Sequence, residues 1–168
     1  MGFHSLNDVL QEQLEDLHSA ETQLITALPK MAQSAHDDEL RQAFEHHLEE
    51  TREHLTRVRE ALSEIGVGTP TEVCKGMQGL IAEGEEMMSK GGVPTAMDAA
   101  LIGAAQRIEH YEIAGYGTAR QLADDCGFDG VKELMDQTLD EESNADKLLT
   151  KIATGGMFKA GINQKATV

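Results

Sequence analysis

Four long segments of the chain with a helical spacing of apolar residues each carry a glutamate within the apolar stripe or directly beside it. These glutamates are Glu21, Glu50, Glu112 and Glu142, and Glu109 lies one turn before Glu112 on the same side of its helix. Burying a carboxylate is costly unless something compensates its charge. Carboxylate oxygens are also ligands that Mn²⁺ and similar divalent ions prefer. Several of them meeting in one core would form a site for two metal ions.

The apolar stripe is clearest between Leu101 and Leu122, where apolar and small residues recur at alternating steps of four and three. This spacing is typical of a helix that packs against other helices. Thr69, Pro70 and Glu72 have the pattern of a helix N-terminus. Together these signals predict long helices at about residues 5–34, 37–65, 95–125 and 129–154, and a shorter one at about 70–90.

The lengths of the connections predict how these helices are arranged. Short joints follow the first and the third long helix, so each consecutive pair is expected to form an antiparallel hairpin. The shorter helix can carry the chain back along the bundle between the two hairpins, because twenty helical residues span about 30 Å. The predicted fold is therefore all-α: a ferritin-like four-helix bundle with an additional short crossover helix, and residues 1–168 in one domain. The tail from Met157 is expected to be loosely ordered or to pack against a partner.

The positions of the glutamates predict that they meet. Glu21 and Glu50 lie at similar distances on either side of the first joint, and Glu112 and Glu142 do so around the second joint. Because the helices of each hairpin are antiparallel, each hairpin brings its two carboxylates to one level.

The two hairpins also resemble each other. The first and third long helices match at an offset of 91 residues, and the segment from Glu50 to His54 resembles the segment from Glu142 to Asp146 at an offset of 92. A repeated ligand set is what a dinuclear carboxylate site requires. The usual di-iron spacing is Glu-x-x-His, and the step of four found here still keeps both side chains on one face of the helix.

Ordinary explanations exist for any single glutamate, namely an exposed side chain or an ion pair with Lys or Arg. No Lys or Arg lies in the four stripes near mid-height. Removing several carboxylates from water costs several kcal/mol each, and the total would exceed a typical protein stability of roughly 5–15 kcal/mol. A metal site is therefore favoured, and a hydrated acidic cavity is the alternative.

Histidines and one tyrosine lie near the predicted site. His54, one turn from Glu50, is the best histidine candidate for a ligand. For His47, on the same face, a packing role or a hydrogen bond to a ligand is favoured, and His18 is a weaker ligand candidate. Tyr116 could donate a hydrogen bond to a ligand carboxylate, although an ordinary buried tyrosine is favoured.

Composition excludes several classes of function. Thirty acidic and fourteen basic residues give a net charge of −16, which argues against nucleic acids and anionic membranes as partners. Cys74 and Cys126 form no Cys-x-x-Cys pair, which excludes a rubredoxin-type iron site; two packing cysteines are favoured, with a disulfide as the alternative. The first residues do not resemble a signal peptide and no apolar run could span a membrane, so a cytoplasmic location is expected.

Four segments resemble the YciE/YciF family of bacterial ferritin-like stress proteins: AETQLITALPKMA, FEHHLEETREH, DAALIGAAQRIEHYEIAGYGTARQLA and LDEESNADKLLTKIA. The resemblance covers nearly the whole chain, and the third segment is the most specific. It implies a rubrerythrin-like bundle with a dimetal-type site, often dimeric, in the bacterial cytoplasm. The ligand positions that it implies are Glu21, Glu50, Glu109, Glu112 and Glu142, together with Asp146 and His54. His18 is a departure, since Tyr is expected there in many members.

The sequence thus predicts a dinuclear non-haem iron or manganese protein of the stress response, present as a homodimer, that reacts with peroxide or oxygen. Oxygen-rich ligands with one or no histidine suit Fe²⁺ and Mn²⁺ better than Cu²⁺ or Zn²⁺. A peroxidase would need an external reductant, whereas a catalase-like disproportionation would not. Two alternatives remain: iron binding and oxidation without sustained turnover, and a non-catalytic helical protein whose metal site stabilises the fold or mediates assembly.

Overall fold

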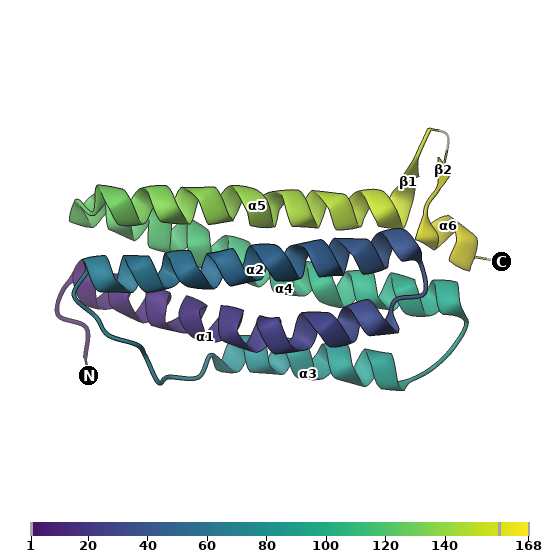
Figure 1. The fold of residues 1–168 in the computed structure, drawn as a ribbon, viewed down its shortest axis with the longest axis horizontal. Coiled ribbons are helices and arrows are strands. Elements are labelled where there is room, and N and C mark those ends of the chain that lie inside the picture. The colour runs from purple at the N-terminus through teal and green to yellow at the C-terminus, as the bar shows by residue number, and fades with distance from the viewer. Residues whose placement is uncertain (1, 158, 168) are drawn as a thin grey trace.

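The computed structural model describes residues 2–157 and 159–167, most of which are helical (Figure 1). The elements in chain order are α1 (Leu6–Ser34), α2 (Asp38–Glu64), α3 (Lys75–Ser89), α4 (Pro94–Cys126), α5 (Asp129–Thr154), β1 (Gly155–Gly156), β2 (Lys159–Ala160) and α6 (Ile162–Ala166). Among the described residues, no helix has both the length and the apolar character that a membrane crossing requires.

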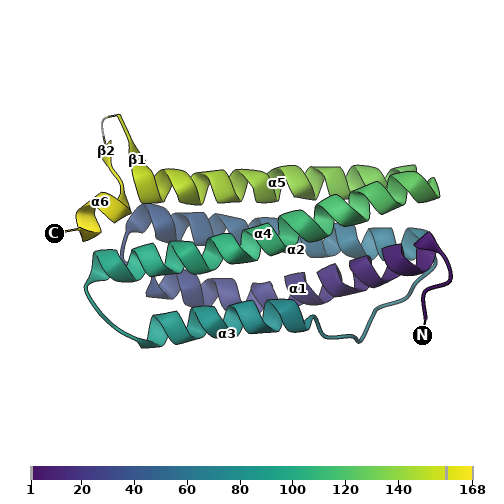
Figure 2. The same cartoon turned by 180° about the vertical axis from the view of Figure 1, so that it is seen from behind.

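Four long helices form the bundle. α1 packs against α2 and α4, and α5 packs against the same two helices, so the four make a closed ring around one long core. α1–α2 and α4–α5 are the two predicted antiparallel hairpins, and α3 runs along the outside against α4 and α1 (Figures 1 and 2). The two-hairpin arrangement with a crossover helix is therefore observed.

Polar contacts hold both ends of α1. α1 begins at the expected capping box, in which the Asp8 N–H donates to Ser5 Oγ at 3.3 Å and the Ser5 N–H donates to Asp8 Oδ2 at 2.9 Å. The joint between α1 and α2 is held from α4, because the buried carboxylate of Asp98 accepts the N–H groups of His36 and Asp37 at 2.8 Å each. The Asp98 contacts tie the joint between α1 and α2 to the level of Asp98 in α4.

The crossover helix is shorter than predicted. α3 begins at Lys75, so the predicted N-cap at Thr69 is wrong. Its N-cap is Cys74, whose Sγ accepts the Met77 N–H at 3.3 Å and whose own N–H donates to Ser19 Oγ of α1 at 2.8 Å. Contacts with α1 therefore decide where the helix starts and override the local sequence signal.

The C-terminal segment packs on its own chain. β1 and β2 pair as a short antiparallel hairpin, and α6 follows against α4 and α5 with Ile162 buried in the core. Within the described residues, the expectation of a loosely ordered tail is thus wrong; residues 158 and 168 lie outside them. Cys74 and Cys126 are both free thiols, so the disulfide alternative is not observed.

The apolar core consists of two clusters toward opposite ends of the bundle. One contains Leu24, Phe44 and Ile152 among others, and the second contains Val58 and Met135 among others. The residues between them in sequence, at the middle of all four long helices, include the predicted glutamates. The fold therefore places a polar layer between two hydrophobic ones.

Candidate metal centre

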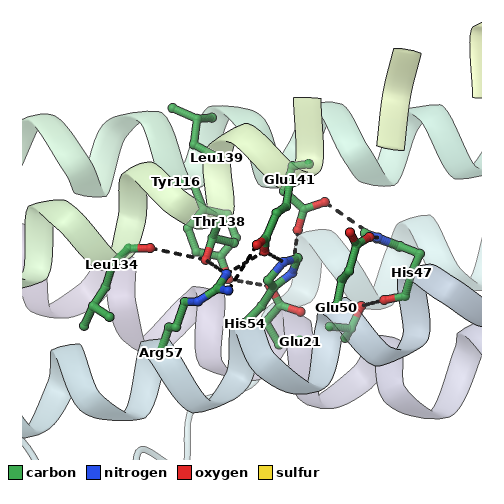
Figure 3. A network of polar contacts seen from close by, with 12 residues as sticks. Glu21, His47, Glu50, His54, Arg57, Tyr116, Leu134, Thr138, Leu139 and Glu141 are labelled. Atoms are coloured by element: carbon green, nitrogen blue, oxygen red, sulfur yellow. Dashed lines mark hydrogen bonds and ion pairs between the residues drawn. The ribbon is translucent and has the colours of Figure 1, made fainter. Parts of the chain in front are cut away.

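The polar layer gathers carboxylates and imidazoles from all four helices of the bundle. Each of these side chains belongs to a residue that is at most 5% exposed. They are Glu21 of α1, His47 and His54 of α2, Glu109 and Glu112 of α4, and Glu142 of α5. Figure 3 shows His54 close to Glu21, with His47 further along α2.

These residues form two adjoining groups of candidate ligands. In each group, one donor atom per residue lies within 4.8 Å of every other. The first group consists of His47, Glu109, Glu112 and Glu142, and the second consists of Glu21, His54 and Glu142. Glu142 belongs to both groups. The arrangement could therefore hold two ions that share one carboxylate.

Several buried atoms of this cluster have no hydrogen-bond partner. They are Glu21 Oε2, His47 Nε2, His54 Nδ1, Glu109 Oε2 and both carboxylate oxygens of Glu112 and Glu142. A buried polar atom without a partner costs about 1–3 kcal/mol, so this concentration of them needs compensation. The ion pairs that the four glutamates make among the described residues involve only histidines. Oxygen-rich donors with two imidazoles fit divalent cations such as Fe²⁺ and Mn²⁺.

The two histidines face the carboxylates closely. His47 Nε2 lies 3.5 Å from Glu109 Oε1 and 3.6 Å from Glu142 Oε2. Burial by itself lowers the pKa of His47, but the negative charges of Glu109 and Glu142 outweigh it and raise the pKa to about 10. Burial also lowers the pKa of His54, but Glu142 and Glu21 outweigh this effect and raise the pKa to about 11. Without metal, both rings are therefore the cations that balance the cluster.

The carboxylates differ from one another in protonation. Burial raises the pKa of Glu112 well above its ordinary value, and the neighbouring charges of Glu142 and Glu21 add to this effect. Burial also raises the pKa of Glu142, but the two histidines outweigh it and hold the pKa below its ordinary value. Glu142 is therefore shifted toward its charged form in the metal-free cluster, and Glu112 is shifted toward its neutral form.

A polar chain outside the cluster orients His54. The ring Nε2 lies 2.8 Å from Glu141 Oε2, and Arg57 Nη2 donates to Glu141 Oε1 at 3.1 Å (Figure 3). Arg57 Nη1 also donates to Thr138 Oγ1 at 3.2 Å. Because Nε2 is engaged by Glu141, Nδ1 is the ring atom directed at the cluster, 2.9 Å from Glu142 Oε1 without the alignment of a hydrogen bond. Sequence reasoning missed Glu141, because its pairing with Arg57 forms only across the bundle.

We expect Glu141→Gln to weaken metal binding about 10- to 100-fold, because the ring of His54 loses the carboxylate that fixes its orientation. The matched control is Asp140→Asn, which removes the same charge from the adjacent, exposed position. Competition with a chelator of known affinity measures both variants. Equal affinities for the two variants would show that Glu141 does not position His54.

Sequence comparisons place the chain in a family. Residues 5–167 match the family described as "Domain of unknown function (DUF892)". The chain is also 39% identical to the protein YciF of Escherichia coli strain K12 over 165 residues, which cover 98% of this chain and 99% of YciF. The chain belongs to the DUF892 family. The resemblance to YciE/YciF proteins is thereby confirmed.

Solved structures confirm the ferritin-like fold of this DUF892 member. The crystal structure of the E. coli stress protein YciF superposes with a TM-score of 0.89 at 36% identity, over 99% of this chain and 100% of YciF. YcfI from Rhodopseudomonas palustris gives a TM-score of 0.86 at 35% identity, over 89% and 96% of the two chains. A dodecameric thioferritin, the bacterioferritin-related protein of Bacteroides fragilis, gives a TM-score of 0.67 at 19% identity. The match covers 86% of this chain and 84% of the thioferritin chain. This last similarity concerns the fold alone.

Two of the predicted ligands are not brought into the cluster of the DUF892 chain. The side chain of Glu50 is 28% exposed, and its Oε2 lies 3.3 Å from Nδ1 of His47, on the side of the ring away from the other carboxylates. The side chain of Asp146 is 21% exposed, and its Oδ1 accepts a hydrogen bond from Gln106 Nε2 at 2.9 Å. Both remain predictions as ligands.

The offset between the two hairpins explains these two positions. The buried residues of α2 and α5 correspond at an offset of 91 residues, not 92. The matching pairs are Leu40 with Val131, Phe44 with Met135, His47 with Thr138, Thr51 with Glu142, Val58 with Leu149 and Ala61 with Ile152. Thr51, rather than Glu50, is therefore the equivalent of Glu142. One residue corresponds to about 100° of rotation around a helix, so Glu50 and Asp146 are turned away from the core.

Three other residues differ from their predicted roles or extend them. The sequence favours a packing role for His47, whereas the structure includes its ring in a candidate ligand group. Tyr116 is fully buried, and its hydroxyl donates to Glu21 Oε1, so it holds a cluster carboxylate. His18 Nε2 lies 3.4 Å from Nε of Arg59, outside both candidate groups.

Proposed function

We propose that this DUF892 protein is a dinuclear non-haem iron or manganese carboxylate protein that reacts with peroxide or oxygen under stress. The observation that carries the proposal is the sharing of Glu142 by two groups of buried donor atoms without hydrogen-bond partners. The E. coli relative is described as a stress protein, which supports the physiological context.

The two groups of candidate ligands would each bind one ion. Glu21, His54 and Glu142 would hold one ion, and His47, Glu109, Glu112 and Glu142 would hold the second. When bound, such a pair of ions supplies two adjacent redox centres.

Charge balance and orientation are the tasks of the protein itself. Tyr116 donates to Glu21 Oε1, which leaves Oε2 of Glu21 free to bind. Burial keeps most of the cluster out of contact with water and strengthens the electrostatic contacts within it.

Glu50 is suited to exchange protons with the solvent. Reduction of peroxide to water consumes two protons, and the cluster itself is buried. The carboxylate of Glu50 is partly exposed and lies beside Nδ1 of His47. Its Oε2 can therefore pass a proton between the solvent and Nδ1 of His47, on the outer side of that ring.

The proposal is tested first by metal content and then by reactivity. Protein produced without a metal-affinity tag is expected to contain about two Fe or Mn ions per chain by mass spectrometry, and Glu112→Ala is expected to lose them. The loaded protein is expected to consume H₂O₂. Release of one O₂ per two H₂O₂ without added reductant identifies disproportionation, whereas dependence on a reductant identifies a peroxidase.

Distinct outcomes would contradict distinct parts of the proposal. Absence of metal from both proteins, with Glu112→Ala equally or more stable, would indicate a hydrated acidic cavity. Metal binding without any reaction with peroxide or oxygen would retain the site and remove the redox function. A single round of Fe²⁺ oxidation would favour iron binding without sustained turnover. The homodimer and the cytoplasmic location stay predictions, and sedimentation measures the first of them.

A further inference from the structure

A cavity of about 160 Å³ lies between α2 and α5 and reaches the cluster. Its walls are largely apolar and include Phe44, Ala145, Leu148 and Leu149. A larger cleft of about 920 Å³ lies beside the N-terminal segment, and its lining contains no residue of the cluster. The smaller cavity is therefore the one that is relevant to the site.

The inner end of this cavity is formed by two cluster residues. His47 and Glu109 line the cavity, although they are only 5% and 3% exposed. His47 Nε2 and Glu109 Oε2 have no hydrogen-bond partner. Two residues of the first ligand group thus line the cavity, while the two atoms without a partner are themselves buried.

The outer end of the cavity is open to solvent. Leu148 is 38% exposed, and the side chain of Glu50 is 28% exposed. Both residues line the cavity, so they lie between the solvent and the buried pair. A change in the size of the residue at position 148 alters the opening and leaves the cluster in place.

The walls and the size of the cavity limit what can enter. Most of the wall surface is apolar, although His46, Glu50 and Asn144 also line it, and apolar surface does not compensate the charge of an ion that has left water. Pockets that hold drug-sized ligands measure about 300–1,000 Å³, which is well above the volume of this cavity. The occupant that fits is a small uncharged molecule that can hydrogen-bond at the inner end.

We propose that the α2–α5 cavity is the entry port for a small uncharged oxidant of the hydrogen peroxide type, and that Leu148 sets its size limit. The nature of the oxidant rests on the proposed function. Bulky hydroperoxides are excluded at the opening, and the metal cluster itself does not discriminate against them.

The test compares two exposed leucines. Leu148 is replaced by Trp and by Ala, and the matched controls are Leu6→Trp and Leu6→Ala, since Leu6 is 52% exposed at the start of α1 and does not line the cavity. The first readout is the rate at which nitric oxide, a small uncharged probe, binds to the Fe²⁺-loaded proteins, followed by absorption. The second is the ratio of the rates of reaction with cumene hydroperoxide and with H₂O₂. Iron content and melting temperature are measured for all proteins.

We expect Leu148→Trp to slow nitric oxide binding about tenfold, and Leu148→Ala to raise the cumene hydroperoxide to H₂O₂ ratio about tenfold, with no change in either control. Equal rates of nitric oxide binding in the Leu148 and Leu6 variants would contradict the assignment of the cavity as the entry port. If the wild-type protein binds iron but consumes no peroxide, the proposed reaction is contradicted. The nitric oxide binding rates still show whether the cavity is the entry port. Failure to bind iron would overturn both.

Discussion

Replacing Glu142 by glutamine is expected to abolish binding of both ions and to destabilise the metal-free protein by about 3–5 kcal/mol. Glu142 is the residue common to both ligand groups. It is also the counter-ion of two buried histidines, with His54 Nδ1 at 2.9 Å and His47 Nε2 at 3.6 Å from its oxygens. Glutamine preserves the shape but removes the charge, so two buried cationic rings lose their shared partner.

Glu112→Gln is the matched control for this prediction. Both oxygens of Glu112 are buried without a partner, and burial holds its pKa well above the ordinary value. A neutral amide there replaces a group whose neutral form burial favours, so the free energy of unfolding of the metal-free protein is expected to change by less than about 1 kcal/mol. Metal content is expected to fall in both variants. Urea unfolding of the metal-free proteins measures the contrast, and equal losses of stability would contradict the assignment of Glu142 as the counter-ion.

The metal-free protein is expected to lose about 4–5 kcal/mol of stability between pH 6.5 and pH 8.5, roughly half of it from each of two buried histidines. His47 and His54 have pKa values of about 10 and 11 in the folded protein, against about 6.5 when unfolded. Between these values the folded state binds more protons than the unfolded state, so the free energy of unfolding falls as the pH rises. Burial raises the pKa of Glu112 and Glu109, which acts in the same direction above the ordinary carboxyl pKa.

Bound metal is expected to reverse this slope. Ions bind the unprotonated imidazole and carboxylate forms, so binding releases protons and strengthens as the pH rises. At a free metal concentration of about 1,000 times the dissociation constant, the stabilisation is about 4 kcal/mol. Denaturant unfolding at pH 6.5 and 8.5, with and without Mn²⁺, measures both slopes. A metal-free protein equally stable at the two pH values would contradict the protonation of the histidines.

The fold could be predicted because its determinants are local and repeated. Apolar stripes of helical period run through each long helix, and short joints force neighbouring helices to pair. The start of α3 could not be predicted in this way. Thr69 has the local features of a cap, but the helix begins after Cys74 because Ser19 of α1 binds the backbone there. A contact with a residue far away in the sequence decides that boundary.

The site could be predicted in part for the same reason. Glu21, Glu112 and Glu142 interrupt apolar stripes, and the structure brings all three together. Glu50 lies beside its stripe rather than in it, and a rotation of one residue turns it toward solvent. Whether a residue next to the stripe faces inward depends on the packing of the neighbouring helices.

Contacts between helices also account for the residues that sequence reasoning missed. Glu141 becomes relevant only because Arg57 and His54 of α2 face it across the bundle. His47 joins the cluster because Glu109 and Glu142 approach its ring from two other helices. No spacing within one helix reveals such pairings.

The division of the apolar core into two clusters has a consequence for the lifetime of the protein. Each end of the bundle is held by its own hydrophobic cluster, and the buried polar cluster lies between the two. Without ions, the middle turns can open while both clusters stay intact, which exposes backbone to proteases at low free energy. Ions bound as proposed would cross-link four helices at that level and raise the free energy of opening. Metal supply and resistance to degradation would thereby be linked in one molecule.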